Sequence, residues 1–227
     1  MPQPDLVIFD CDGVLIDSEI IAARVEAEVL TQAGYEISPE EIAALYSGLN
    51  FSEILLRVEK VSQIPLQASL IDQADAIIDK RLKDVRAIEG VTQAVAAVKV
   101  PRCICSNSSA ERLKMTLGLT GLDRFFVDRV YSALAIPDGK PKPAPDVFLY
   151  AAGQMKANPA NTFVVEDSVH GIHGAIAAGM RVIGFTGGAH SYPSHSDILT
   201  EAGAETVINR WRDLVPVLDA LSEWADA

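Results

Sequence analysis

Short apolar runs alternate with longer segments of helical periodicity along most of the chain. The apolar runs predict buried strands at residues 6–9, 102–105, 162–165, 181–185 and 206–208. Apolar positions at helical spacing predict helices over residues 91–98, 109–117, 169–178 and 214–224. Strands that alternate with helices are typical of a parallel, doubly wound sheet, so we predict a Rossmann-like α/β core.

The segment between the first two predicted strands has a different pattern. Helical spacing recurs there, with predicted helices at residues 18–34, 39–46, 52–61 and 70–85. We therefore predict an all-helical cap domain over residues 17–86. It is inserted into a catalytic core made of residues 1–16 and 87–227.

Polar side chains stand directly after three of the predicted strands. They are Asp10 and Asp12, Ser106 and Asn107, and Glu166 and Asp167. In doubly wound sheets, ligands bind outside the carboxyl ends of the strands. We expect these side chains to line one site at that edge of the sheet.

Composition narrows the classes of partner. The chain has 227 residues and a formal net charge of −12, which disfavours nucleic acid because binding to its phosphates needs a basic surface. No apolar run approaches the roughly 20 residues of a membrane helix, and the first residues lack the basic start of a signal peptide. An odd count of three cysteines does not suit a disulfide framework. We expect a cytoplasmic protein without nucleic-acid or membrane partners, either a monomer or a weak homodimer.

The sequence DCDG at residues 10–13 offers two carboxylates at the end of the first strand. Asp10 can attack phosphorus and form an aspartyl-phosphate. Asp12 can protonate the leaving alkoxide and later deprotonate the attacking water. Taken alone, the motif also fits a turn with capping aspartates. A calcium loop does not fit, because Leu15 and Ile21 occupy the positions of its glycine and its closing glutamate.

Two further segments carry groups suited to phosphate. Ser106 and Asn107 stand at a strand-to-helix turn, where a hydroxyl and backbone N–H groups can hold phosphate oxygens. A helix N-cap is the simpler interpretation of this pair taken alone. Lys142 lies between prolines in the loop GKPKPAPD, which favours a fixed position for its ammonium group beside a phosphoryl group. We expect Lys140 in the same loop to be solvated.

Glu166 and Asp167 are adjacent acids at the end of an apolar strand. A cation would relieve their mutual repulsion, and Mg²⁺ binds a few carboxylates together with water and substrate phosphate. The alternative is that they cap the following helix. His170 and His173 could suggest another metal pair, but their place at the start of that helix favours a surface role.

Four motifs together resemble those of the haloacid dehalogenase superfamily, in its phosphatase branch with a small helical cap. They are FDCDGVLIDSE, CSNSS, KPKPAPDVF and VVEDSVHGIHGAIAAGM, in the family's order and over nearly the whole chain. The resemblance implies Asp10 as the nucleophile and Asp12 as the general acid and base. It implies Ser106 and Lys142 as phosphate-binding residues.

The resemblance also implies a Mg²⁺ cofactor. Its ligands would be the Asp10 carboxylate, the backbone carbonyl of Asp12 and the carboxylate of Asp167, with Glu166 binding directly or through water. The dehalogenases of the superfamily lack the second aspartate of the first motif, so Asp12 argues against dehalogenation.

The nearest subgroup looks like beta-phosphoglucomutase, phosphoglycolate phosphatase and the sugar-phosphate phosphatases. Mutases of this subgroup carry a histidine soon after the first motif and an arginine in the cap loop after a glycine. This chain has SEIIAA and SGLNFSE at those places, which favours hydrolysis. We predict a Mg²⁺-dependent phosphatase acting on small sugar or short-chain metabolite phosphates. A phosphomutase is the alternative, in which Arg57, Lys60 or Lys80 holds a second phosphate.

The cap carries no motif that identifies the substrate. Its loop at residues 47–52 contains Gly48, Asn50 and Phe51, and could reach a small polar substrate. We predict that the cap closes over the core and that this loop selects the leaving group. A fixed helical domain that only covers the sheet edge is the alternative.

Overall fold

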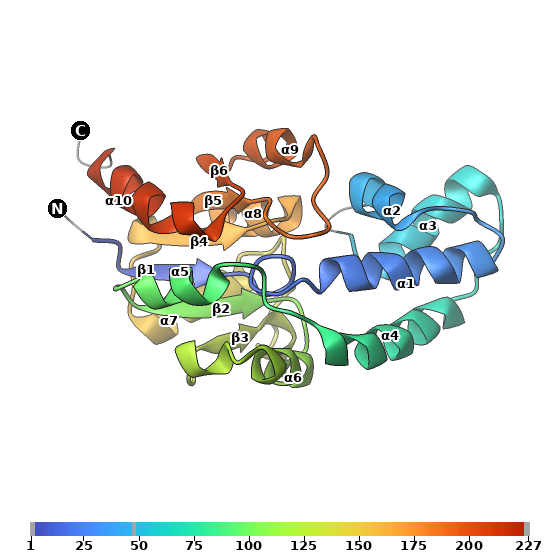
Figure 1. Cartoon of the computed structure of the whole chain (residues 1–227), viewed down its shortest axis with the longest axis horizontal. Helices are drawn as coiled ribbons and strands as arrows, with labels where there is room; N and C mark the ends of the chain where they lie inside the picture. Colours follow the sequence, from blue (N-terminus) through green and yellow to red (C-terminus); the bar gives the residue numbers. More distant parts are fainter. Residues whose placement is uncertain (1–2, 47–48, 225–227) are drawn as a thin grey trace.

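The structure is a computed structural model that describes residues 3–46 and 49–224. It contains a parallel sheet of six strands in the order β3-β2-β1-β4-β5-β6, which confirms the predicted doubly wound α/β fold (Figure 1). The strands are β1 (Leu6–Phe9), β2 (Arg102–Ser106), β3 (Val130–Ser132), β4 (Thr162–Glu166), β5 (Arg181–Phe185) and β6 (Thr206–Ile208).

Helices cover both faces of the sheet because successive strand residues point to opposite sides. Val7 and Phe9 of β1 belong to a core that includes side chains of α5 (Val91–Ala97), α6 (Ala110–Thr120) and α10 (Leu214–Trp224). Leu6 and Ile8 pack on the other face with α7 (Asp146–Met155), α8 (Val169–Ala177) and α9 (His195–Glu201). The strands are thus apolar on both faces, and the polar residues come where the strands end.

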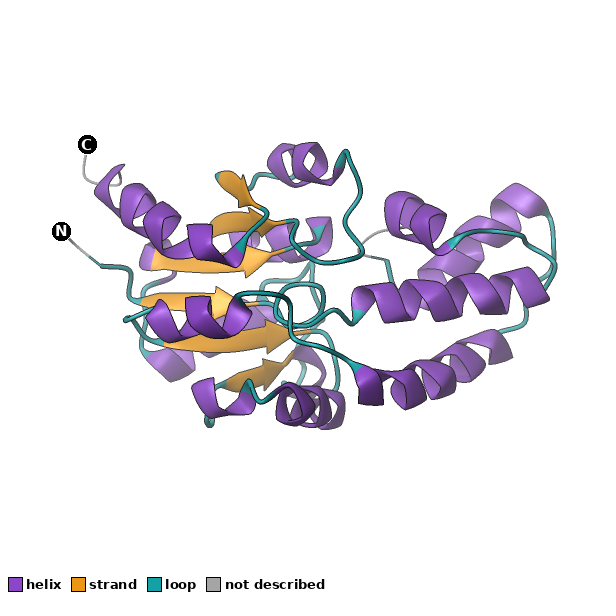
Figure 2. Cartoon of the chain, viewed as in Figure 1, coloured by secondary structure: helices purple, strands orange, loops and turns teal. Residues whose placement is uncertain are grey.

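Four helices form a separate block beyond the carboxyl ends of the strands. They are α1 (Glu19–Gln32), α2 (Pro39–Tyr46), α3 (Phe51–Ser62) and α4 (Ser69–Arg81). The arrowheads of the central strands point toward this block, and loops fill the space between (Figure 2). Every helix of the described residues falls short of the length and apolar content that crossing a membrane requires.

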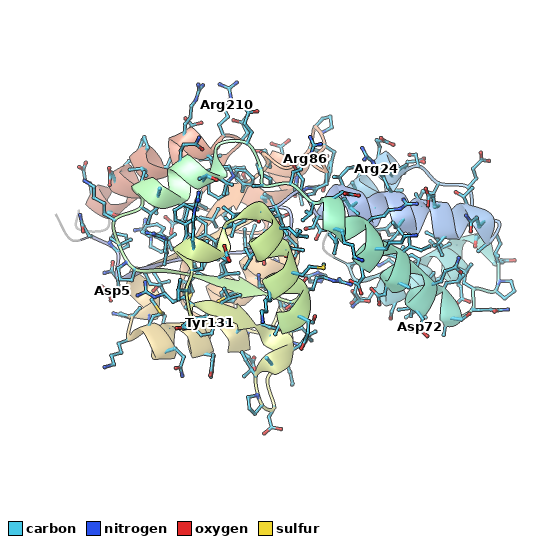
Figure 3. All side chains as sticks on the ribbon, turned by 60° about the horizontal axis from the view of Figure 1, so that its bottom comes forward. Asp5, Arg24, Asp72, Arg86, Tyr131 and Arg210 are labelled. Atoms are coloured by element: carbon cyan, nitrogen blue, oxygen red, sulfur yellow. The ribbon has the colours of Figure 1, made fainter. Side chains whose placement is uncertain are left out.

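The two chain crossings into the helical block lie side by side. Asp17 donates its backbone N–H to the carbonyl of Arg86 at 3.0 Å, and Ile88 donates to Leu15 at 3.0 Å. Arg86 is labelled at this junction in Figure 3. The predicted domain boundaries, at residues 16/17 and 86/87, fall on these paired crossings, and the division into two domains stays a prediction.

Candidate active site

A cavity of about 870 Å³ lies between the carboxyl edge of the sheet and the helical block. The core contributes residues at the carboxyl ends of β1, β2 and β4, which are neighbours in the sheet. All six polar residues expected at the strand ends line it: Asp10, Asp12, Ser106, Asn107, Glu166 and Asp167. Lys142 joins them from the loop before α7.

Lys142 is the cationic centre of the site. Its Nζ lies 2.6 Å from Oδ1 of Asp10, 2.6 Å from Oε1 of Glu166 and 2.8 Å from the carbonyl oxygen of Cys105. The three donors of the ammonium group therefore have three acceptors. The lysine and both carboxyl groups are almost fully buried, so the ion pairs exchange little with water.

Burial and charge act in opposite directions on these groups. Burial raises the pKa of Asp10 well above its usual value, although Lys142 counteracts this. Burial also raises the pKa of Glu166, again against Lys142. For Lys142 itself, burial opposes the charged form, but the charges of Asp10 and Glu166 outweigh it and the pKa of the ammonium is raised. The lysine thus keeps its charge and favours the ionised form of the proposed nucleophile.

Asp12 lines the same cavity and accepts three hydroxyl hydrogen bonds. Ser18 donates to its Oδ1 at 2.7 Å, while Ser106 and Ser108 donate to its Oδ2 at 3.1 and 2.8 Å. Three donors fix the direction of the carboxylate. Sequence reasoning did not single out Ser18 and Ser108, because a serine near a helix start is far more often a cap than a partner of a distant carboxylate.

Asn107 has a different contact from the one expected. Its amide donates to the carbonyl of Lys142 at 3.3 Å and accepts from the N–H of Lys142 at 2.9 Å. Through this pair of bonds the turn after β2 fixes the lysine loop. Its direct contact with phosphate stays a prediction.

The acidic residues fit a metal ion. Asp10, Glu166 and Asp167 are buried, and one ligand oxygen from each lies within 4.8 Å of the others. Of these three acids, Lys142 contacts Asp10 and Glu166. Three buried carboxyl groups thus lie close together, and carboxylate oxygens are what Mg²⁺ binds.

A segment to which sequence analysis assigned no site residue also reaches the site. His190 lies in the stretch after β5, and its Nε2 is 2.9 Å from Oδ2 of Asp167. His195 places its own Nε2 at 2.7 Å from the backbone carbonyl oxygen of Asp167. The signal was weak, because TGGAHSYPSH has no spacing that points to a partner in another strand.

The residues of the predicted selection loop in the cap differ in whether they line the cavity. Asn50 lines the cavity and caps α3, and its Oδ1 accepts the N–H of Glu53 at 3.0 Å. Phe51 is buried among the helices and does not line the cavity. Gly48 lies outside the described residues.

On the cap side, α1 and α4 each contribute one face to the cavity, together with residues of α2 and α3. The polar residues on these faces are Glu19 and Glu26 of α1 and Asp75, Asp79 and Lys80 of α4. Burial, and then the charge of Asp75, raises the pKa of Glu26 to about 7. From the core, Arg112 of α6 approaches Asp79 at 2.8 Å and Asp75 at 3.5 Å.

Comparison with known proteins gives the class. The family of haloacid dehalogenase-like hydrolases matches residues 7–185. The 6-phosphogluconate phosphatase of Escherichia coli (strain K12) is 30% identical over 215 residues, which is 93% of this chain and 96% of that protein.

Two solved structures support the same class. A haloacid dehalogenase-like protein of unknown function from Agrobacterium tumefaciens is 55% identical, with a TM-score of 0.93, over 96% of this chain and 99% of that one. A HAD family hydrolase from Deinococcus radiodurans, with bound phosphate and sodium, is 31% identical, with a TM-score of 0.79, over 92% and 93%. The chain belongs to the haloacid dehalogenase-like hydrolase family, as the four motifs indicated.

Proposed function

We propose that the chain is a Mg²⁺-dependent phosphatase that hydrolyses small sugar or short-chain metabolite phosphates through an aspartyl-phosphate on Asp10. The observation that carries this proposal is the contact of Asp10 with Lys142 at 2.6 Å, beside Asp12 and the buried acids Glu166 and Asp167. The site then offers a nucleophile in contact with a cation, and beside them a group that can exchange a proton.

In the first step an oxygen of Asp10 forms a bond to phosphorus, and the bond from phosphorus to the leaving oxygen breaks. Asp12 gives its proton to that oxygen, so the leaving group departs as an alcohol. In the second step Asp12 takes a proton from water. The water oxygen bonds to phosphorus, the bond to Asp10 breaks, and inorganic phosphate is released.

The surrounding groups orient these two aspartates. Lys142 holds Asp10 and favours its ionised form, and its charge would also attract the phosphoryl oxygens. Ser18, Ser106 and Ser108 hold Asp12 until a substrate competes for it. Asp10, the Asp12 carbonyl, Glu166 and Asp167 would hold Mg²⁺, which when bound neutralises charge on a phosphoryl group and helps to orient it.

The cavity supports a small polar substrate. A volume of about 870 Å³ suits a phosphorylated metabolite, and the carboxyl groups of Glu19 and Glu26 can accept hydrogen bonds from hydroxyl groups. The relative from Escherichia coli is a 6-phosphogluconate phosphatase, which favours a substrate of that size. We propose that residues 17–86 act as the cap that selects it, with Asn50 among the contacts.

A phosphomutase is the second candidate, and one observation supports it. Lys80 lines the cavity on the cap side, where a second phosphate would lie. Arg57 and Lys60 are exposed and do not line it. Incubation with a hexose 1-phosphate distinguishes the two, since a phosphatase releases inorganic phosphate and a mutase yields the isomeric phosphate.

The covalent step can be tested by acid quench. We expect the wild-type protein, given an aryl phosphate and Mg²⁺, to carry a phosphoryl group on the peptide with Asp10, and hydroxylamine to remove it. Asp12→Asn should accumulate this species, because an aryl leaving group needs little protonation while attack by water loses its base. Asp10→Asn should neither form it nor turn over, a loss of several powers of ten. Rapid turnover by Asp10→Asn would refute the proposal.

A further inference from the structure

The stretch from residue 186 to residue 195, here called the strap, follows β5 and contacts Asp167 from two directions. His190 is 7% exposed, and its Nε2 lies 2.9 Å from Oδ2 of Asp167. Nε2 of His190 and Oδ2 of Asp167 are within ion-pair distance, although neither ring nitrogen of His190 has a well-aligned hydrogen bond among the described residues. A buried imidazole in this state is costly unless a nearby negative charge stabilises it.

His195 holds the other end of the same residue. Its Nε2 lies 2.7 Å from the backbone carbonyl oxygen of Asp167, so this nitrogen carries the proton. Its Nδ1 is then the acceptor, and the hydroxyl of Ser191 lies 3.2 Å from it. The ring of Tyr192 stacks on His195 with the ring centres 4.8 Å apart. One strap therefore fixes both the main chain and the side chain of Asp167.

Two glycines create the space for the imidazole. A Cβ on Gly13 would clash with Oδ2 of Asp167 and lie 2.8 Å from Cε1 of His190. A Cβ on Gly188 would lie 2.7 Å from the His190 ring and 2.8 Å from the carbonyl oxygen of Gly13. Gly13 belongs to the DCDG turn, so the strap packs directly against the loop that bears Asp10 and Asp12.

The strap is also tied to the cap junction. Ala189 donates its N–H to Oδ1 of Asp17 at 2.8 Å. Asp17 in turn donates its own N–H to Arg86 in the paired crossing. The position of His190 is thus set by the core at one side and by the chain crossing at the other.

We infer that His190 is a positioning residue that holds Oδ2 of Asp167 and leaves its other carboxylate oxygen turned toward Asp10 and a bound Mg²⁺. This inference rests on the metal site of the proposed function. Groups that hold a metal-binding carboxylate from behind commonly change metal affinity by about 10–100-fold when removed. His190 takes no part in bond making, and Lys142 and Asp12 keep their contacts without it.

Calorimetric titration of the metal-free protein with Mg²⁺ tests the inference without any substrate. We expect His190→Ala to weaken binding by about 10–100-fold and His190→Gln, whose amide N–H can contact Oδ2 of Asp167 in place of the imidazole, to recover part of the loss. His173→Ala is the matched control, because His173 is exposed on α8, and it should bind as the wild type does. His190→Leu keeps the bulk of the ring, and it serves if His190→Ala does not fold.

A second readout separates positioning from general damage. With Mg²⁺ at saturation, kcat and KM of His190→Ala should return to within about threefold of the wild type, while the Mg²⁺ concentration for half activity rises. Binding of Mg²⁺ by His190→Ala or His190→Leu at wild-type strength would overturn the inference, and so would a wild-type protein that binds no Mg²⁺. If binding weakens as expected but no phosphate ester is hydrolysed, the inference holds and the proposed function fails.

Discussion

Replacing Lys142 by methionine should destabilise the metal-free protein strongly, because it removes the one ammonium that contacts two buried carboxyl groups. The side chain keeps its apolar length, so little packing is lost. Asp10 and Glu166, each 2.6 Å from Nζ, would then face each other without a cation. Removing one partner of a buried ion pair typically costs about 3–5 kcal/mol. For a chain of this size that corresponds to a fall in Tm of about 6–20 °C.

The stability lost in Lys142→Met should grow as the pH rises. Without Lys142 the pKa values of Asp10 and Glu166 rise further above their unfolded values, since burial acts on them unopposed. The folded variant then binds more protons than the unfolded chain, so its stability falls as the pH rises above the unfolded pKa. The deficit against the wild type should be smaller at pH 5 than at pH 8.

Thermal unfolding followed by circular dichroism, in EDTA at both pH values, measures this. Lys140→Met is the matched control, because Lys140 is exposed two residues earlier in the same loop, and it should change stability by less than about 0.5 kcal/mol. Mg²⁺ should restore part of the Tm of Lys142→Met, as a ligand of the folded state does. A Lys142→Met variant as stable as Lys140→Met would refute the assignment of the lysine as the charge that holds the site together.

Three further changes test the cap. Arg112→Ala removes the partly exposed ion pair with Asp79, which is 2.8 Å long, so the free energy of unfolding should change by less than about 1 kcal/mol. The KM, measured by steady-state kinetics, should rise severalfold because the cap opens more often. Glu26→Gln should stabilise the protein by about 1–3 kcal/mol near pH 8 and not near pH 4.5, because the pKa of the wild-type carboxyl is raised to about 7 and its ionisation between those pH values destabilises the folded state. Tm measured against pH tests this, and a Tm profile of the variant parallel to that of the wild type would contradict it. Asn50→Ala removes the cap of α3 and should cost about 1 kcal/mol, and kcat/KM should change unequally among sugar and short-chain phosphates; an equal change for every substrate would exclude a selective role.

The place of the candidate site followed from the sequence because its polar residues stand at the ends of strands. β1, β2 and β4 were visible as apolar runs, and each is followed at once by polar residues. Since these strands are neighbours in the sheet, Asp10, Ser106 and Glu166 meet without any long-range information. The lysine loop was recognisable because prolines flank Lys142.

Other parts depend on contacts that no local pattern encodes. β3 spans only Val130–Ser132, so its apolar run is too short to stand out. The helix α7 was not predicted, because its apolar positions Val147 and Ala151 come directly after the proline-rich loop. His190 contacts Asp167 because β4 and β5 are paired, and the order of the strands along the chain does not reveal which strands pair.

The paired crossings join the helical block to the core through two neighbouring segments of the chain. Asp17 and Arg86 are hydrogen-bonded to each other, so the block leaves the core and returns at almost the same point. An insert of another length or shape, provided that its ends meet, could replace residues 17–86 without moving β1 or α5. Under the proposed function, substrate preference would change by exchange of a whole module, while the residues proposed to bind the phosphoryl group stay where the sheet puts them.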